Sequence, residues 1–334
     1  MPRVLVVDPL APSDGAIAEA VRVLRAGGLV ALPTETVYGL GARALDERAL
    51  ARVFAAKGRP LHHPLIAHVA NETQAARLAA HWPASASALA QAFWPGPLTM
   101  IVRRQAHLPA AIAGGGDSIA VRVPSHPVAL AVLAALGEPV AAPSANRYQG
   151  LSPTSAQHVL KELGDQVDLV LDAGPCDAGI ESTVVDVRQK PLRVLRPGVI
   201  RLSALRAVVA ETEEGTERVA EATPRVSPGM AARHYAPRAR LVVADTSADA
   251  QRIAGGIASE GGRVGIVTHE PREISPHDTV FLQAMPPDPA EYARALYGTL
   301  HRLDDSGMTA IVVVRVPDDE AWGAVADRLR RASG

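Results

Sequence analysis

Apolar residues along the chain follow two patterns that alternate over the first 200 residues. Short segments rich in β-branched residues alternate with Ala/Leu-rich stretches whose apolar residues recur at helical spacing. We expect strands at 29–33, 64–70, 98–104, 118–124, 139–144, 167–174, 182–188 and 192–198, and helices at 13–26, 46–56, 72–80, 84–93, 126–136 and 155–163. The pattern predicts an α/β domain over residues 1–205, with a large, mixed, twisted sheet.

The pattern changes after residue 205. Residues 203–223 carry acids and few large apolar groups, which is typical of a surface helix or linker, and TPRVSPGMAARHYAP is too rich in Pro and Gly for a regular element. From residue 239 strands again alternate with helices, the helices at 248–259, 288–303 and 318–332. We therefore predict a linker over 206–238 and a small Rossmann-like α/β domain over 239–334.

Composition narrows the class of protein. A chain of 334 residues, 48% hydrophobic and 21% charged, fits about two globular domains. A net charge of −1 gives no general attraction to nucleic acid or anionic membranes. The single cysteine, Cys176, allows no internal disulfide, no signal peptide is visible, and the longest apolar run, 127–136, is too short to span a membrane. We expect a cytoplasmic protein.

Several familiar motifs are weak or missing. GLGARA at 39–44 matches the loose dinucleotide fingerprint, but the residues before it favour a structural turn. No phosphate loop of the GxxxxGK[ST] form and no G-x-S-x-G elbow occurs. His62, His63 and His68 have no Cys or acidic partner at the spacing of a zinc site.

Polar side chains stand where apolar segments end. PTETVYG follows the strand predicted at 29–33, KGRP follows the helix at 46–56, and PSAN follows the strand at 139–144. Loops at strand ends can present such groups to one crevice, although short polar residues are equally good caps and KGRP is ordinarily a solvated loop. Lys57 of KGRP is one of only three lysines beside 31 arginines. Arg122, within the alternating strand IAVRVP, needs a carboxylate partner from the protein or from a substrate.

Together these segments resemble one family. LPTETVYGLGARA, AAKGRPLHHPLIAHV, WPGPLTMIV, IAVRVPSHP, AAPSANRYQGLSPT, GIESTVVDV, LRPG and SPGMAARHYAP occur in the order found in threonylcarbamoyl-AMP synthases of the long form, which have a YrdC-like first domain and a C-terminal extension. The resemblance covers about residues 1–237. Beyond residue 239 it rests on architecture and position.

The resemblance implies a reaction. Family members combine L-threonine, bicarbonate or CO2, and ATP with Mg²⁺, giving threonylcarbamoyl-AMP and pyrophosphate. Separate tRNA threonylcarbamoyl-transferase proteins then transfer the threonylcarbamoyl group to the adenosine next to the anticodon, forming threonylcarbamoyladenosine (t6A). Such chemistry needs positioning and cations more than a protein nucleophile.

The resemblance also implies a set of site residues. For ATP they are Lys57, Arg59, Ser144, Asn146, Ser152, Arg196, His234 and Tyr235, the first four counted as catalytic. For L-threonine they are Thr34, His68, Ser118, Arg122 and Ser182. The loop with His234 and Tyr235 is expected to act as a lid over the nucleotide. The sequence names no Mg²⁺ ligand and no general base.

Two other functions stay open on the sequence. A double-stranded RNA-binding protein would use a basic concave surface, but residues 1–205 hold only 19 basic and 16 acidic residues, and aromatic residues are 3% of the chain, so we do not expect strong direct tRNA binding. A related carbamoyl or adenylyl transferase with another acceptor could use the same scaffold. The SPGM and HYAP segments favour the stand-alone synthase.

Overall fold

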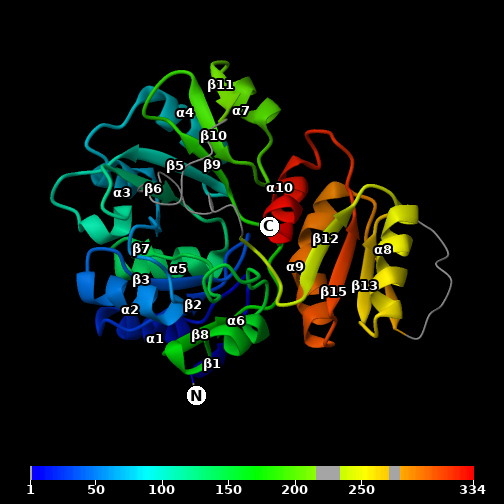
Figure 1. Cartoon of the computed structure of the whole chain (residues 1–334). Helices are drawn as coiled ribbons and strands as arrows, with labels where there is room; N and C mark the ends of the chain where they lie inside the picture. Colours follow the sequence, from blue (N-terminus) through cyan, green and yellow to red (C-terminus); the bar gives the residue numbers. More distant parts are fainter. Residues whose placement is uncertain (1, 216–233, 271–278) are drawn as a thin grey trace. The chain divides into compact units, whose positions relative to one another are not determined.

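The computed structural model describes residues 2–215, 234–270 and 279–334, which form two units (Figure 1). Unit 1 consists of Met1–Tyr148, Pro153–Asp177 and Glu181–Met230, and unit 2 of Gln149–Ser152, Ala178–Ile180 and Ala231–Gly334. The predicted linker, 206–238, is described only at 206–215 and 234–238, so most of the expected lid lies outside the described residues.

A single mixed sheet organises the described part of unit 1. Its strand order is β1-β8-β2-β3-β7-β4-β6-β5-β9-β10-β11, and parallel and antiparallel neighbours both occur. The strands are β1 (Arg3–Val6), β2 (Val30–Leu32), β3 (Gly39–Arg43), β4 (Ile66–His68), β5 (Leu98–Arg103), β6 (Ser118–Arg122), β7 (Val140–Ala141), β8 (Leu169–Asp172), β9 (Thr183–Asp186), β10 (Leu192–Arg196) and β11 (Thr212–Glu214). The predicted large mixed α/β sheet is confirmed.

Local sequence signals set where the helices of unit 1 begin. The side chains of Ser13, Asp46, Asn71 and Ser155 each accept a hydrogen bond from a backbone N–H in the first turn of the helix that follows. The helices are α1 (Asp14–Arg25), α2 (Glu47–Lys57), α3 (Glu72–Leu78), α4 (Ala84–Phe93), α5 (Pro127–Leu136), α6 (Ala156–Leu163) and α7 (Leu202–Val208), with short 3-10 turns at Ala110–Ala113 and Gly164–Gln166.

The two faces of this sheet are covered differently. One face packs into the largest core with residues of α2, α3 and α4, among them Val53, Leu78 and Leu89. On the opposite face, α1 and α5 cover β2, β7 and β8. Farther along that second face, a small apolar cluster consists of strand residues only, with Ile66, Ile101, Ala120 and Val184 as its buried members. We call this part of the sheet the site face.

One expectation about local structure is wrong and another holds only in part. GLGAR forms strand β3 instead of a turn, and neighbouring strands approach Gly41 closely: a Cβ there would stand 3.0 Å from the backbone oxygen of Val30. Within 203–223, the expected surface helix is present as α7, but Thr212–Glu214 forms β11, which pairs in parallel with β10 and is the edge strand of the sheet. Pairing across the sheet outweighs the low β propensity of acidic residues there.

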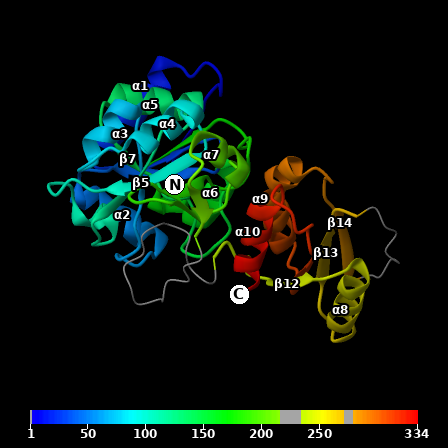
Figure 2. The same ribbon diagram turned by 90° about the horizontal axis from the view of Figure 1, so that it is seen from above.

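Unit 2 is a second α/β layer structure. Its four described strands are parallel throughout and stand in the order β12-β15-β13-β14. They are β12 (Arg240–Ala244), β13 (Val264–Thr268), β14 (Val280–Ala284) and β15 (Ala310–Val314), and the helices are α8 (Ser247–Ser259), α9 (Pro289–Asp305) and α10 (Gly323–Ser333). Figures 1 and 2 show α8 on one side of this sheet, and α9 and α10 on the other.

The predicted alternation of strands and helices beyond residue 239 is confirmed. If the four described strands are numbered 1 to 4 along the chain, their order across the sheet is 1-4-2-3. A dinucleotide-binding fold has the order 3-2-1-4 in its first four strands, so the likeness to a Rossmann fold does not extend to strand order.

Candidate functional site

Strand alternation places several predicted site residues on the site face. In β6, Ile119 and Val121 point into the large core, whereas Ala120 belongs to the opposite cluster. Because successive side chains of a strand alternate between faces, Ser118 and Arg122 share the face of Ala120. His68 is the parallel partner of Arg122 and lies on the same face.

Arg122 is the buried cation of this face. Its Nε donates to the Gly96 carbonyl at 3.3 Å and its Nη1 to Thr36 Oγ1 at 2.9 Å. Its Nη2 lies 2.7 Å from Glu35 Oε1 in a buried ion pair. A guanidinium has five N–H groups, so these three described partners leave two for a further acceptor.

Glu35 and Thr34 belong to the turn between β2 and β3. Burial is the largest single influence on Glu35 and would raise its pKa, but the charge of Arg122, the hydrogen bond from Arg122 and backbone hydrogen bonds together outweigh it and hold that pKa below its ordinary value. The Thr34 hydroxyl donates to the Val37 carbonyl at 2.6 Å and accepts from the N–H groups of Thr36 and Val37. The turn thus holds Glu35 and Thr36 against the Arg122 guanidinium.

His68 is buried beside Arg122 at the end of β4. Burial, reinforced by the positive charge of Arg122, lowers the pKa of His68 to about 3. Its Nδ1 has no hydrogen-bond partner among the described residues. The imidazole is therefore neutral at physiological pH and keeps one ring nitrogen unused.

Ser182 and Arg196 meet at one end of β9 and β10. Arg196 donates from Nε to the Ser182 carbonyl and from Nη2 to Ser182 Oγ, both at 3.0 Å. Ser182 Oγ also lies 2.8 Å from Thr99 Oγ1 of β5. Arg196 was predicted for ATP and Ser182 for threonine, but the structure makes them one hydrogen-bonded group.

The segment Lys57-Gly58-Arg59 ends α2 with a sharp change of direction. Gly58 has φ +62°, the left-handed conformation that glycine adopts without strain at helix ends. Arg59 then turns inward and donates from Nη2 to the Pro64 carbonyl at 2.9 Å. Lys57 and Arg59 are both buried, which corrects the ordinary picture of KGRP as a solvated loop.

Lys57 is tied to the segment containing Ser144 and Asn146. Its Nζ donates to the backbone oxygens of Ser144 and Asn146, both at 2.5 Å, and approaches Asn146 Oδ1 at 3.5 Å. Burial and the nearby charge of Arg59 lower the pKa of Lys57 well below its ordinary value. Three of the four residues predicted as catalytic are therefore in direct contact.

Ser118 lies at the other end of β6 from Arg122. Its antiparallel partner is Arg103 of β5, whereas Arg122 faces the opposite end of that strand. Four residues of extended strand separate Ser118 from Arg122 by about 13 Å. The structure thus brings Ser118 together with Arg103 and not with the Arg122 group, although both groups share one face.

Ser152, His234 and Tyr235 belong to unit 2. The Ser152 carbonyl lies 3.2 Å from a ring nitrogen of His301, and the His234 N–H donates to the Arg331 carbonyl at 3.0 Å. Tyr235 has φ +62°, rare for a bulky residue, and its ring lies under the Arg328 guanidinium at 5.3 Å. Both predicted lid side chains are buried in the described structure.

Three partners of the site were not predicted individually: Glu35, Thr36 and Thr99. Glu35 and Thr36 lie within the PTETVYG segment, and the need of Arg122 for a carboxylate was the signal that could have named Glu35. Thr99 could be found only from the pairing of β5 with β9. Cys176 is a buried free thiol, and burial raises its pKa, in accordance with a structural role.

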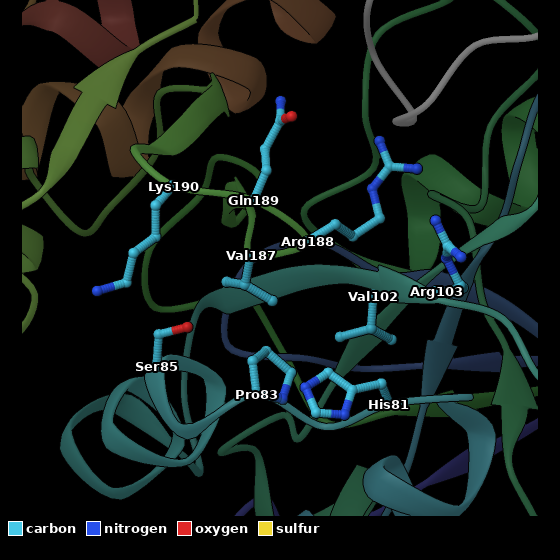
Figure 3. A pocket seen from close by; sticks show the side chains of 9 residues that line it. All are labelled: His81, Pro83, Ser85, Val102, Arg103, Val187, Arg188, Gln189 and Lys190. Carbon is cyan, nitrogen blue, oxygen red and sulfur yellow. The ribbon is translucent and has the colours of Figure 1, made fainter.

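A pocket of about 350 Å³ opens near the ends of β5 and β9 (Figure 3). His81, Pro83 and Ser85 form one wall, and Val102 and Val187 lie opposite them. No predicted site residue lines this pocket. Within the described ranges, no three His, Cys, Asp or Glu side chains group to hold a metal ion. None of the described helices is long and apolar enough to cross a membrane.

Comparison with known proteins agrees with this organisation. A family model described as "Telomere recombination" and labelled for YrdC-like proteins matches residues 22–198, and one described as "Threonylcarbamoyl-AMP synthase, C-terminal domain" matches 200–334. The threonylcarbamoyl-AMP synthase of Pyrococcus abyssi is 39% identical over 94% of this chain and 93% of its own. The threonylcarbamoyl-AMP synthase of Bacillus subtilis is 36% identical over 98% of this chain and 96% of its own.

Solved structures extend the likeness to three dimensions. The P. abyssi Sua5 protein complexed with L-threonine matches with TM-score 0.90 and 38% identity, over 99% of this chain and 97% of that one. A structure of its H234A/Y235A variant matches with TM-score 0.90 and 36% identity, over 100% of this chain and 96% of that one. Those two residue types and numbers coincide with His234 and Tyr235 here.

The two-unit α/β fold, the YrdC-like family model and the named relatives together define an enzyme of the nucleotidyltransferase class. The near full-length relatives and the two family models narrow the class further. The chain belongs to the threonylcarbamoyl-AMP synthase family.

Proposed function

We propose that this protein joins L-threonine, bicarbonate or CO2, and ATP into threonylcarbamoyl-AMP, releasing pyrophosphate. The observation that carries the proposal is the buried Arg122 guanidinium, which keeps two N–H groups beyond its described partners. A relative of the same fold has been solved with L-threonine, whose carboxylate is an acceptor suited to such a group.

The threonine end of the site would be the group around Arg122. Its guanidinium binds the substrate carboxylate, with its direction fixed by Glu35 and Thr36. Thr34 and Ser182 supply hydroxyl contacts to the amine or the side-chain hydroxyl. His68, being neutral, would stand beside the bound threonine without adding a second positive charge, and its unused ring nitrogen can accept a hydrogen bond from the substrate.

The ATP end would use the Lys57 group with Arg59 and Arg196. Because Lys57 already donates to two carbonyls, its first task is to hold Ser144 and Asn146 in place, so that their side chains meet phosphate oxygens. Arg59 and Arg196 add charge against the triphosphate. Ser152 would add a contact to the ATP phosphates, and the loop with His234 and Tyr235 would act as a lid over the nucleotide.

The reaction then needs positioning more than covalent help from the protein. The threonine nitrogen forms a bond to the carbon of CO2 and loses a proton, which gives a carbamate. A carbamate oxygen attacks the α-phosphorus of ATP, and the bond from that phosphorus to the bridging oxygen breaks, so that pyrophosphate leaves. The buried site face would keep water away from the mixed anhydride.

Mg²⁺ would enter with ATP. The described residues show no group of three acidic or imidazole ligands for a resident ion. Mg²⁺ commonly keeps several waters and binds through substrate phosphates, where it neutralises their charge. The product would pass to separate threonylcarbamoyl-transferase proteins for t6A formation in tRNA, and strong direct tRNA binding by this chain is not expected.

The decisive assay measures pyrophosphate release from Mg-ATP, with L-threonine and bicarbonate each omitted in turn. We expect release to require both. Release that continues without threonine, or with another amine acceptor in its place, would favour the related carbamoyl or adenylyl transferase. Salt-sensitive binding of double-stranded RNA without turnover would favour the RNA-binding alternative.

A further inference from the structure

The pocket at the carboxyl ends of β5 and β9 has no part in the site described above (Figure 3). Its volume of about 350 Å³ is enough for a small organic molecule. Thr99, which contacts Ser182, lies at the other end of β5, four strand residues or about 13 Å from Arg103, which lines the pocket. The pocket is therefore a separate feature of unit 1.

The middle of this pocket is apolar. Val102 of β5 and Val187, which follows β9, form one side, and Pro83 of the connection between α3 and α4 faces them. Both valines belong to the large core, so this side is closely packed. Figure 3 shows the guanidinium groups of Arg103 and Arg188 on the opposite side of the strands from the valines, so the two arginines border the pocket without filling it.

Polar groups without a protein partner gather where α4 begins beside this pocket. The helix starts at Ala84, directly after Pro83, with no side-chain cap and no acidic residue in its first turn. Among the described residues, the backbone N–H groups of Ala84 and Ser85 and the Ser85 hydroxyl have no hydrogen-bond partner. Such N–H groups at a helix N-terminus favour an anion.

The charges around the pocket also favour an anion. Lys190 lines the pocket, and none of the described lining residues is acidic. The Lys190 ammonium lies 2.9 Å from Glu211, but the two side chains are 68% and 62% exposed, and a pair of this kind contributes little stability. A bound anion can therefore compete with Glu211 for the ammonium. Figure 3 shows the Lys190 ammonium and Ser85 on the same side of the pocket, away from His81.

We propose that this pocket binds a small organic monocarboxylate. The carboxylate accepts hydrogen bonds from the N–H groups of Ala84 and Ser85 and from the Lys190 ammonium. The apolar body of the ligand lies between Pro83 and Val187. One ammonium and one helix N-terminus supply about one and a half positive charges, which suit a carboxylate better than a phosphate dianion. This site does not depend on the proposed reaction.

The test is a fluorine NMR titration of the full chain with 4-fluorobenzoate, which has one carboxylate and an apolar ring. We expect saturable binding with Kd on the order of 1 mM. 4-Fluorobenzyl alcohol, which lacks the charge, and fluoroacetate, which lacks the ring, should each bind about tenfold more weakly. Saturating L-threonine should leave the Kd for 4-fluorobenzoate unchanged, because Arg122 does not line this pocket.

Two substitutions at exposed positions test the anion contacts. Ala84→Pro removes one N–H group at the first helical position, where Pro is well tolerated and the preceding residue is already extended. Lys190→Gln removes the positive charge. Each should weaken 4-fluorobenzoate binding about threefold, and the double variant about tenfold. Lys161→Gln, at an exposed position of α6, should bind the probe as the wild type does.

The possible results separate this site from its alternatives. If 4-fluorobenzoate shows no saturation at about ten times the expected Kd, the site is wrong. Unchanged binding in the double variant, or equal binding of the alcohol, would also overturn it. Displacement of the probe by L-threonine would place the probe at the Arg122 group instead. If Ala84→Pro disturbs α4, Lys190→Gln alone decides the question, because its exposed side chain contributes little to folding.

Discussion

Strand β6 of unit 1 and strand β15 of unit 2 are both completely buried, but they differ in the residues that they bury. Both are five residues long and buried at every position. The sequence of β15 is AIVVV, whereas β6 is SIAVR and ends on a buried arginine. Aliphatic side chains gain stability from burial, but a guanidinium loses its hydration and needs partners to offset that loss.

The difference between the two strands indicates which of them takes part in ligand binding. In β15 each buried residue can be explained by packing alone. In β6, packing explains Ile119 and Val121 but not Arg122, whose described partners leave two N–H groups unused. A buried polar group that the protein itself does not fully satisfy is where we expect a ligand, and the following predictions test that contrast.

Arg122→Met should have the largest effect. We expect kcat/KM for L-threonine to fall about 100- to 1000-fold, as when a catalytic donor is removed. The free energy of unfolding should also fall by about 3–5 kcal/mol, because Glu35 is left buried without its cation. Steady-state kinetics and urea denaturation measure the two effects.

A double variant separates these two effects. Arg122→Met with Glu35→Gln removes the whole ion pair and should regain much of the unfolding free energy without regaining activity. If the double variant binds L-threonine as the wild type does, Arg122 is only a structural residue and the contrast with β15 disappears.

Lys57→Met should separate function from stability. The loss of the amine should lower kcat/KM for ATP about 100-fold, because the side chains of Ser144 and Asn146 are no longer held in position. The free energy of unfolding should change little, because the loss of two hydrogen bonds to carbonyls is offset by the removal of a buried amine whose charged form burial and Arg59 disfavour. Lys161→Met, at an exposed position of α6, is the control for both measurements. A marked loss of stability together with normal ATP use would contradict this account of Lys57.

His68 should make the folded state sensitive to acid. Its pKa is about 3 when folded and 6.5 in its ordinary state, so the unfolded chain binds the proton first as pH falls. Stability is therefore lost progressively below pH 6.5, by about 2 kcal/mol between pH 7 and pH 5. That window lies above the ordinary pKa of carboxylates such as Glu35. Urea denaturation at each pH should show a flatter dependence in His68→Gln, whereas His107→Gln, at an exposed position, keeps the wild-type slope.

Ile311→Val in β15 should have the smallest effect. Removing one buried methyl group should lower the free energy of unfolding by about 0.5–1.5 kcal/mol. Because packing is all that we ascribe to this strand, kcat/KM for every substrate should stay at the wild-type value. A loss of turnover measured well below the unfolding temperature would show that β15 takes part in the reaction.

Much of this fold could be predicted from periodicity, because burial on sheet faces imposes alternation. That is why β5, β6 and β9 lie where the apolar pattern placed them. Strand β11 could not be predicted, since its residues are poor strand formers and are held by pairing with β10. Strand β3 was missed because glycines, needed for close approach, are also the residues of turns.

The candidate site was predicted as a set of residues more than as a geometry. Arg122 could be singled out because a charge within an alternating strand needs a partner, and Glu35 provides one. The contact of Lys57 with the backbone of residues 144 and 146 joins segments 87 and 89 residues apart, which no local pattern encodes. The position of Ser118 beside Arg103 likewise depends on strand register.

The most direct test of the central claim is a crystal structure of this protein with L-threonine. The account predicts that the substrate carboxylate lies within hydrogen-bond distance of the Arg122 guanidinium, on the site face, with His68 and Ser182 around it. L-threonine bound elsewhere, with both remaining N–H groups of Arg122 turned to protein acceptors, would contradict it.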